Sequence, residues 1–210
     1  MQASNYFSTT FWFDYKPEFL DSLNNESNKY IKDAKKSKKE YIKKYGDFGT
    51  SYHSTSLIKD NKFLDFKKYV GEKSLQFLDA QGFDMSHYQA SFSEMWVQEF
   101  AKKGGGHHSA HMHWNQHVSG FYFLKCSEKT SYPIFHDPRT GARATKLKMK
   151  PEQGMIWPVA EQVKFTPKPG TIMIFPGYLE HEFALDLGIE PFRFIHWNIQ
   201  AIPKEMARDV

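Results

Sequence analysis

The sequence predicts an α+β protein in which a β-rich core carries helices packed on one side. Residues 1–90 show helix-like amphipathic patterns, whereas residues 91–202 alternate short aromatic and β-branched runs with Gly, Pro and Asp turns. The length of 210 residues favours one domain spanning 1–210. With 40% apolar and 17% aromatic residues, the chain can bury a substantial core.

The N-terminal part, 1–90, is predicted to be mainly helical. Apolar residues recur at loosely helical spacing among many lysines between Lys29 and Lys44, which predicts an exposed basic helix. Such a helix can bind nucleic acid, but charge alone carries no recognition geometry, so a solvated surface is favoured. A second amphipathic pattern runs from Phe63 to Leu78, is interrupted at Gly71 and closes near Gly82.

The second half is predicted to form an antiparallel sandwich or small barrel. Its strand-like runs are ASFSEMWVQEF, SGFYFLKC, YPIFHDP, TIMIFPG and FRFIHWNIQAI. Turn residues separate these runs, as in a sheet of short antiparallel strands.

Cysteine content and the lack of long apolar runs predict the compartment. The single cysteine, Cys126, excludes an internal disulfide framework and a multi-cysteine zinc site. No run reaches about 18 apolar residues, and the N-terminus lacks the order of a signal peptide. We therefore expect a cytoplasmic protein with no membrane partner. The net charge of +4 decides little about other partners, and no feature predicts an oligomeric state.

Histidines are concentrated in one segment, because five of the ten lie between His107 and His117. On a strand, residues at i and i+2 point to the same face, and His111 and His113 have that spacing. Two imidazoles on one face suit a divalent metal. His181, which follows an apolar strand and a Pro-Gly turn, is the best third ligand.

Four segments in a fixed order carry a family resemblance: HMHWNQHVSGFYFL, PIFHDPR, FTPKPGTIMIFPGYLEH and FRFIHWNI. The stretch from roughly Ser91 to Ile202 resembles the Fe(II)/2-oxoglutarate-dependent dioxygenases, in particular the prolyl-hydroxylase-like branch often encoded by phages and bacteria. The resemblance implies a double-stranded β-helix (a cupin-like jelly roll) over 91–202, with Fe(II) in its mouth, 2-oxoglutarate chelating the metal, and O₂ as the oxidant. It also implies the cytoplasm of a bacterial or phage-infected cell.

Carried over to this sequence, the resemblance makes His111 and His181 the two histidine ligands. Arg193, twelve residues after His181, would bind the distal carboxylate of 2-oxoglutarate. A guanidinium suits this role because it stays charged and pairs with a carboxylate in a bidentate manner.

The third ligand departs from the family pattern. Most members place a carboxylate two residues after the first histidine, where this chain has His113. His113 itself is the favoured third ligand, because the i, i+2 geometry needs no further assumption. Two alternatives stay open: Asp137 of the HDPR turn reaches the metal, or the register shifts to include Asn115.

Further contacts are predicted around the metal. Tyr122 and Gln98 are candidates for binding 2-oxoglutarate, although Tyr122 faces inward only if Phe121 and Phe123 face outward. Trp114 and Arg139 are candidates for contacting the substrate. No catalytic residue beyond the metal ligands is predicted.

The sequence thus predicts an Fe(II)- and 2-oxoglutarate-dependent oxygenase, a hydroxylase acting on a peptide side chain, an amino acid or another small molecule. Two alternatives remain. One is a three-histidine, cupin-type metal dioxygenase or metal-binding protein that does not use 2-oxoglutarate. The other is a non-enzymatic jelly roll whose basic helix binds nucleic acid, which loss of affinity with added salt would reveal.

Overall fold

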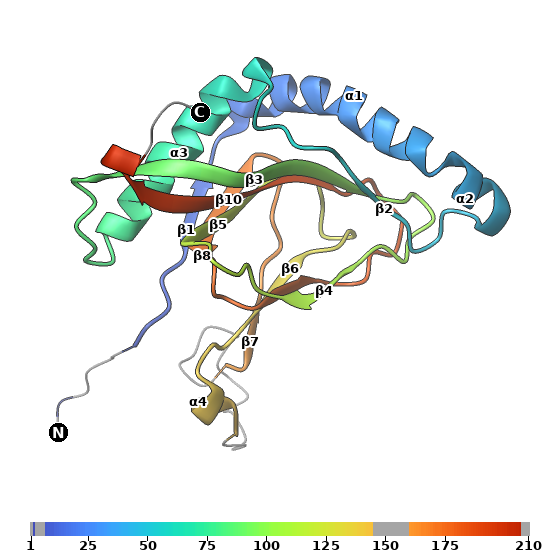
Figure 1. Ribbon diagram of the computed structural model, residues 1–210. Helices are drawn as coiled ribbons and strands as arrows, with labels where there is room; N and C mark the ends of the chain where they lie inside the picture. The colour runs from blue at the N-terminus through green and yellow to red at the C-terminus, as the bar shows by residue number, and fades with distance from the viewer. Residues whose placement is uncertain (1, 3–6, 145–159, 207–210) are drawn as a thin grey trace.

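The computed structural model of the protein describes residues 2, 7–144 and 160–206 (Figure 1). Its helices are α1 (Leu20–Ser37), α2 (Lys39–Tyr45), α3 (Leu64–Asp79) and α4 (Thr140–Ala144), with 3₁₀ turns at Pro17–Phe19, Asn61–Phe63 and Lys204–Met206. Its strands are β1 (Trp12–Tyr15), β2 (Ser51–His53), β3 (Tyr88–Phe100), β4 (His108–His111), β5 (Val118–Lys125), β6 (Pro133–His136), β7 (Gln162–Lys164), β8 (Thr171–Pro176), β9 (His181–Phe183) and β10 (Arg193–Pro203).

The strands form two antiparallel sheets. The larger sheet has six strands in the order β1-β8-β5-β10-β3-β2, and the smaller has four in the order β4-β9-β6-β7. Side chains from both sheets meet in one aromatic cluster between them, which includes Phe121 and Phe194 from the larger sheet and Phe135 and Phe183 from the smaller. This arrangement is a double-stranded β-helix with helices added, and it confirms the predicted α+β fold class.

Helices α1 and α3 cover the outer face of the larger sheet, above β3 and β10 in Figure 1. Phe66 and Phe77 of α3 pack with Ile195 and Trp197 of β10 in a second buried cluster. Burying each such side chain contributes roughly 1.5–3 kcal/mol. The central strands of the larger sheet are therefore buried on both faces.

Two short strands come from the part predicted to be mainly helical. β1 pairs with β8, with Trp12 opposite Ile174, and β2 pairs with β3, with Ser51 opposite Phe100. Each adds to one edge of the larger sheet. Strands of three or four residues are too short to show a periodic pattern in the sequence. They are recognised only from their pairing with the edge strands of the sheet.

Helix α3 runs through Gly71 without the predicted interruption. Gly71 is buried where the helix crosses β3, and a Cβ added there would lie 3.5 Å from the Phe92 ring. Close packing on the sheet thus outweighs the low helix propensity of glycine.

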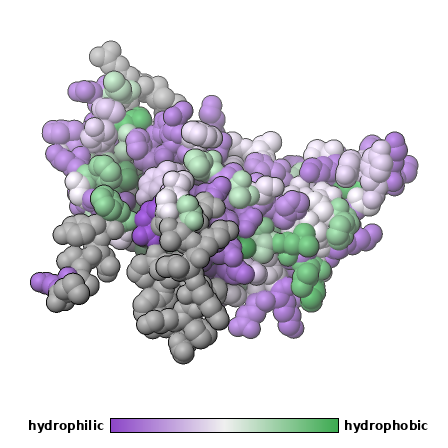
Figure 2. Space-filling model, turned by 90° about the horizontal axis from the view of Figure 1, so that it is seen from below, coloured by the Kyte–Doolittle hydropathy of each residue, from purple (hydrophilic) through white to green (hydrophobic). Residues whose placement is uncertain are grey.

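The face seen from below is largely hydrophilic, with separate hydrophobic patches (Figure 2). Within the part of the chain that the structure describes, no helix is both long and apolar enough to cross a membrane.

Candidate metal centre

Three histidines converge at one end of the smaller sheet. His111 is the last residue of β4 and lies directly opposite His181, the first residue of β9. His113 lies two residues beyond β4, where its backbone N–H donates to the carbonyl of Gly177 at 2.9 Å. The ring centroids are 4.5 Å apart for His111 and His181, 5.0 Å for His111 and His113, and 5.1 Å for His113 and His181. One potential ligand atom from each ring lies within 4.8 Å of the other two.

Backbone carbonyls orient two of the rings. Nδ1 of His111 lies 2.7 Å from the carbonyl oxygen of Ser109, and Nδ1 of His181 lies 2.9 Å from that of Leu179. Because a carbonyl only accepts, both Nδ1 atoms carry the proton and both Nε2 atoms keep a free lone pair. Nε2 of His181 is buried without a partner, as is Nε2 of His113.

His113 is oriented by a side-chain amide. Its Nδ1 lies 3.0 Å from Nδ2 of Asn198, which also donates to Oε2 of Glu94 at 2.8 Å. Oδ1 of Asn198 in turn accepts from the Ser119 hydroxyl at 2.5 Å. Every polar atom of the buried Asn198 side chain therefore has a partner, and the amide is fixed from three sides.

Burial lowers the pKa of two of the three imidazoles, those of His113 and His181. Desolvation, reinforced by the charges of neighbouring histidines, lowers the pKa of His113 to about 4, and the same causes lower the pKa of His108 to about 4. The pKa of His181 is also held well below its usual value, mainly by burial. Neutral imidazoles are the form that binds a metal, so the lowered pKa values of His113 and His181 favour metal binding at neutral pH.

An aromatic wall closes the site behind His181. The rings of Phe175, Phe121 and Phe135 lie 5.0, 5.5 and 5.7 Å from that of His181, between centroids. All three phenylalanines are buried. The wall excludes water from this side of the histidines.

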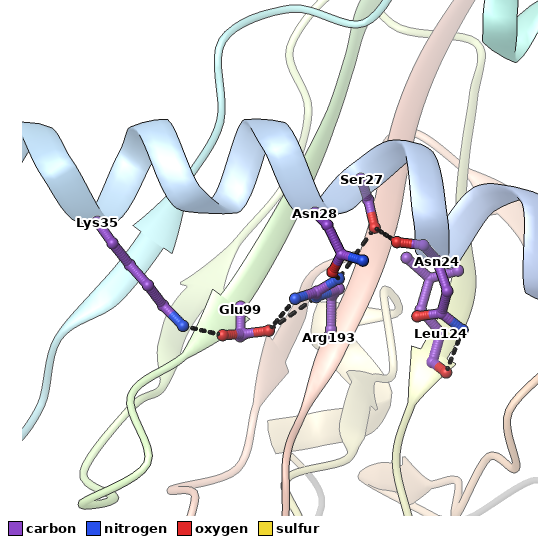
Figure 3. A network of polar contacts seen from close by, with 7 residues as sticks. All are labelled: Asn24, Ser27, Asn28, Lys35, Glu99, Leu124 and Arg193. Atoms are coloured by element: carbon purple, nitrogen blue, oxygen red, sulfur yellow. Dashed lines mark hydrogen bonds and ion pairs between the residues drawn. The ribbon is translucent and has the colours of Figure 1, made fainter.

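Arg193 lies on the other face of the larger sheet, so its assignment to the 2-oxoglutarate site is wrong. Its guanidinium points at α1 (Figure 3), where Nη1 donates to Asn28 at 2.8 Å and to Ser27 at 3.1 Å. Nε and Nη2 both bind Oε2 of Glu99, at 2.7 and 2.6 Å. Lys35 of α1 binds the other Glu99 oxygen at 2.5 Å. The arginine thus ties α1 to the sheet.

The other two residues predicted to bind 2-oxoglutarate are also engaged elsewhere. Tyr122 is fully buried in the cluster beneath the helices, and its hydroxyl donates to the carbonyl of Lys16 at 2.8 Å. The side chain that faces the histidines from β5 is Phe121. Gln98 is buried, and its amide donates to the hydroxyl of Ser51.

The alternative third ligands and the substrate candidates also have places in the structure. Two groups of potential metal ligands occur among the described residues, and neither includes Asp137. The Asp137 carboxylate accepts hydrogen bonds from Nε and Nη2 of Arg139, at 3.0 and 2.8 Å. Asn115 lies in the loop after His113 with a positive φ of 60°. Trp114 is 80% exposed beside the histidines.

Several residues near the centre were not predicted. The second ligand group consists of Glu94, His113 and His196, and Asn198 links its first two members. His196 and Asn198 alternate along β10 with Ile195, Trp197 and Ile199, which belong to the helix-covered cluster. The alternation of these polar and apolar residues can be seen in the sequence. It does not determine which face of the strand is the inner one.

Comparisons with known proteins agree with this arrangement. Residues 94–187 match the family of putative 2OG-Fe(II) oxygenases. The structure is similar to a Pseudomonas putida prolyl-4-hydroxylase (10% identity, TM-score 0.57, covering 92% of this chain and 94% of the other). It is likewise similar to EctD from S. alaskensis with 2-oxoglutarate and 5-hydroxyectoine (10% identity, TM-score 0.57, covering 92% of this chain and 73% of the other). A third similar structure is AviO1 from Streptomyces viridochromogenes Tue57 (10% identity, TM-score 0.57, covering 93% of this chain and 91% of the other). No curated protein matches.

The residues fit iron, because three imidazoles converge with potential ligand atoms within 4.8 Å of one another. They do not provide the predicted arginine for 2-oxoglutarate, since Arg193 is bound to Glu99. The match over residues 94–187 and the shared fold nevertheless agree: this part of the chain is similar to the putative 2OG-Fe(II) oxygenases, and the fold is the one seen in the prolyl-4-hydroxylase and EctD structures.

Proposed function

We propose that this protein hydroxylates an unactivated C–H bond of a peptide side chain, an amino acid or another small substrate, with Fe(II) held by His111, His113 and His181. The observation that carries the proposal is the convergence of three imidazoles with potential ligand atoms within 4.8 Å of one another. Iron and 2-oxoglutarate, when bound, supply the activation of O₂. The chain itself contributes orientation of the ligands and a water-free aromatic wall.

The exposed rim beside the histidines is the proposed substrate surface. Trp114 directly follows His113, and Tyr178 directly follows Gly177, the residue whose carbonyl holds His113. Their exposed fractions are 80% and 54%, and Met112 is also exposed. Aromatic side chains offer a large contact area at a low entropic cost, which suits a peptide segment or a planar molecule. Arg139 is paired with Asp137, so we assign it a structural role first.

The test is an anaerobic titration of the metal-free protein with Fe(II) and then with 2-oxoglutarate, followed by an assay for succinate in the presence of O₂. We expect saturable Fe(II) binding, a weak visible charge-transfer band on adding 2-oxoglutarate, and succinate formation. Absence of both the band and succinate would refute the proposal.

Four alanine variants, at His111, His113, His181 and Asp137, identify the ligands. Each histidine variant should weaken Fe(II) binding, whereas Asp137→Ala should keep it. If Asp137→Ala loses iron while His113→Ala retains it, the three-histidine assignment is wrong.

The same titration distinguishes the proposed enzyme from a three-histidine dioxygenase that does not use 2-oxoglutarate. The position of Arg193 favours this alternative. That enzyme would bind Fe(II) through the same histidines but show neither the band nor succinate.

A further inference from the structure

Asn198 connects His113 of the metal centre to two other side chains, Ser119 and Glu94. Its own side chain lies in β10 and is 1% exposed. Nδ2 lies 2.8 Å from Oε2 of Glu94 and 3.0 Å from Nδ1 of His113, and Oδ1 lies 2.5 Å from the Ser119 hydroxyl. The orientation of this amide therefore determines whether Nδ1 of His113 donates or accepts a hydrogen bond.

Two of these three partners suit either orientation of the amide. A hydroxyl both donates and accepts, so Ser119 can face Oδ1 or Nδ2. A neutral imidazole has one nitrogen that donates and one that accepts, so Nδ1 of His113 takes either role, depending on the tautomer. Neither residue distinguishes the amide from its inverted form, in which Oδ1 and Nδ2 have exchanged places.

Glu94 does distinguish the two orientations, because a carboxylate only accepts. The amide atom that lies 2.8 Å from its Oε2 must therefore be the NH₂ group of Asn198. The other hydrogen of this group is directed at His113, so Nδ1 of His113 accepts and the imidazole proton lies on Nε2.

This tautomer of His113 does not bind a metal, because Nδ1 is engaged by the amide and a protonated Nε2 has no free lone pair. The other two histidines differ, since their Nδ1 atoms face the carbonyls of Ser109 and Leu179 and leave Nε2 free. Metal-ligating histidines usually donate their second ring N–H to an acceptor in this manner. His113 reaches the same state when the amide inverts and its oxygen accepts from Nδ1.

Inversion of the amide has a cost at Glu94. It would place Oδ1 of Asn198 against the carboxylate, where two acceptors repel each other. Glu94 is exposed, so its side chain can turn into solvent, but its hydrogen bond to Asn198 is then lost. The net free energy of metal binding through His113 therefore includes the cost of displacing Glu94.

We infer that Glu94 is a positioning residue that acts through Asn198: it holds His113 in the tautomer that does not bind a metal, and loading of the centre requires the amide to invert. The inference rests on the proposed function in one respect, since it treats His113 as a metal ligand. The tautomer itself belongs to the metal-free protein and is tested without iron.

The experiment locates the imidazole proton of His113 by ¹⁵N NMR of the metal-free protein at neutral pH. In the unmodified protein we expect the proton on Nε2. In Glu94→Gln, whose amide both donates and accepts, a measurable share of the molecules should carry it on Nδ1. In the double variant Glu94→Gln/Asn198→Asp, the introduced carboxylate only accepts, so the proton should lie on Nδ1 throughout.

The affinity for Fe(II), measured by anaerobic titration, gives a second readout. Because Glu94→Gln removes the cost of inversion, it should strengthen Fe(II) binding by about three- to tenfold, and the double variant should strengthen it further. The loss of a nearby negative charge would by itself weaken the binding of a cation. The sign of the change therefore separates control of the tautomer from simple electrostatics.

Two variants serve as controls. Glu182→Gln removes an equal charge beside His181, but this carboxylate lies 3.4 Å from Nε2 of His136, so the tautomer of His113 should stay the same and Fe(II) binding should not strengthen. Ser119→Ala should lower Tm, because either orientation of the amide loses one hydrogen bond, without moving the proton of His113.

Three results would overturn the inference: a proton on Nδ1 of His113 in the unmodified protein, an unchanged tautomer population in Glu94→Gln, or weaker Fe(II) binding in Glu94→Gln. The last result is the one expected if Glu94 is itself a metal ligand. If neither the unmodified protein nor any variant binds Fe(II), the proposed function fails, whereas the position of the proton still decides whether Glu94 controls the tautomer.

Discussion

Arg193 and Glu99 form an ion pair that is almost fully removed from solvent, with side-chain exposures of 5% and 7%. Desolvation of two charges is expensive, and here it is offset by five contacts (Figure 3). Arg193 makes four of them, two to Glu99 and one each to Ser27 and Asn28, and Lys35 makes the fifth to Glu99. Because Ser27, Asn28 and Lys35 all belong to α1, the pair holds that helix on the sheet.

Replacing Arg193 should therefore lower the free energy of unfolding much more than replacing an exposed arginine. Arg193→Met leaves Glu99 buried with Lys35 alone, and we expect it to lower the free energy of unfolding by about 3 kcal/mol or more. Arg139→Met, which breaks a pair whose arginine is 42% exposed, should cost less than about 1 kcal/mol. Urea unfolding of both variants checks this, and equal losses would contradict it.

The buried carboxyl of Glu99 should also make the stability of the protein depend on pH. Burial opposes its ionisation, but the hydrogen bond from Lys35 and the charge of Arg193 outweigh it, so the pKa is held below its usual value. A carboxyl with a lowered folded pKa stabilises fully above its unfolded pKa of about 4.5, and this stabilisation is lost as pH falls through the folded pKa. The stability difference between the unmodified protein and Glu99→Gln should thus shrink below about pH 4.5. A constant difference from pH 7 to pH 3 would refute it.

At the scale of elements, one glycine of β5 leaves room for a tryptophan of β10, its partner across the sheet: Gly120 lies opposite Trp197. A Cβ added at Gly120 would lie 2.2 Å from the Trp197 ring and 2.8 Å from the carbonyl oxygen of Met173. Trp197 is fully buried and lies between His196 and Asn198 along β10. The glycine thus makes room for the tryptophan that fixes the inner face of the strand.

Gly120→Ala should therefore be destabilising by about 1–3 kcal/mol, as expected for overpacking. The matched control is Gly141→Ala in α4, where an added Cβ meets nothing within 4 Å and alanine favours the helix. Thermal unfolding compares the two variants. A Gly120→Ala protein as stable as the control would contradict the close packing of Trp197 against Gly120.

The structure brings the three predicted histidines together, but the strand geometry expected for His111 and His113 accounts for only part of this. Of His111 and His113, only His111 lies on a strand, whereas His113 is held in place by its hydrogen bond to Gly177 and by Asn198. The i, i+2 rule for a strand thus named the residues, while a loop and a partner strand provide their convergence.

At the scale of the whole molecule, the metal centre connects the two sheets. His111 and His181 belong to the smaller sheet, and His113 is tied to the end of β8 and to β10 of the larger one. A ligand that binds only the folded state stabilises it by about 2.7 kcal/mol at 100 times its Kd.

Adding Fe(II) at about 100 times its Kd under anaerobic conditions should raise Tm by about 5–10 °C, and a chelator should reverse the shift. His181→Ala should abolish the shift. His107→Ala, an exposed histidine of the same segment, should preserve it. A shift that persists in His181→Ala would place the metal elsewhere.

The sequence by itself determined the order of helices and strands, the β-rich core and the three candidate ligands, because periodicity and motif spacing are local properties. Only the tertiary structure decided which face of β10 looks inward. Both faces are apolar, one with Ile195 and Trp197 and the other with Phe194, because helices cover the sheet on one side and the second sheet covers it on the other. Hydrophobicity cannot separate two buried faces. Packing therefore turned Arg193 towards α1 and His196 towards the metal centre.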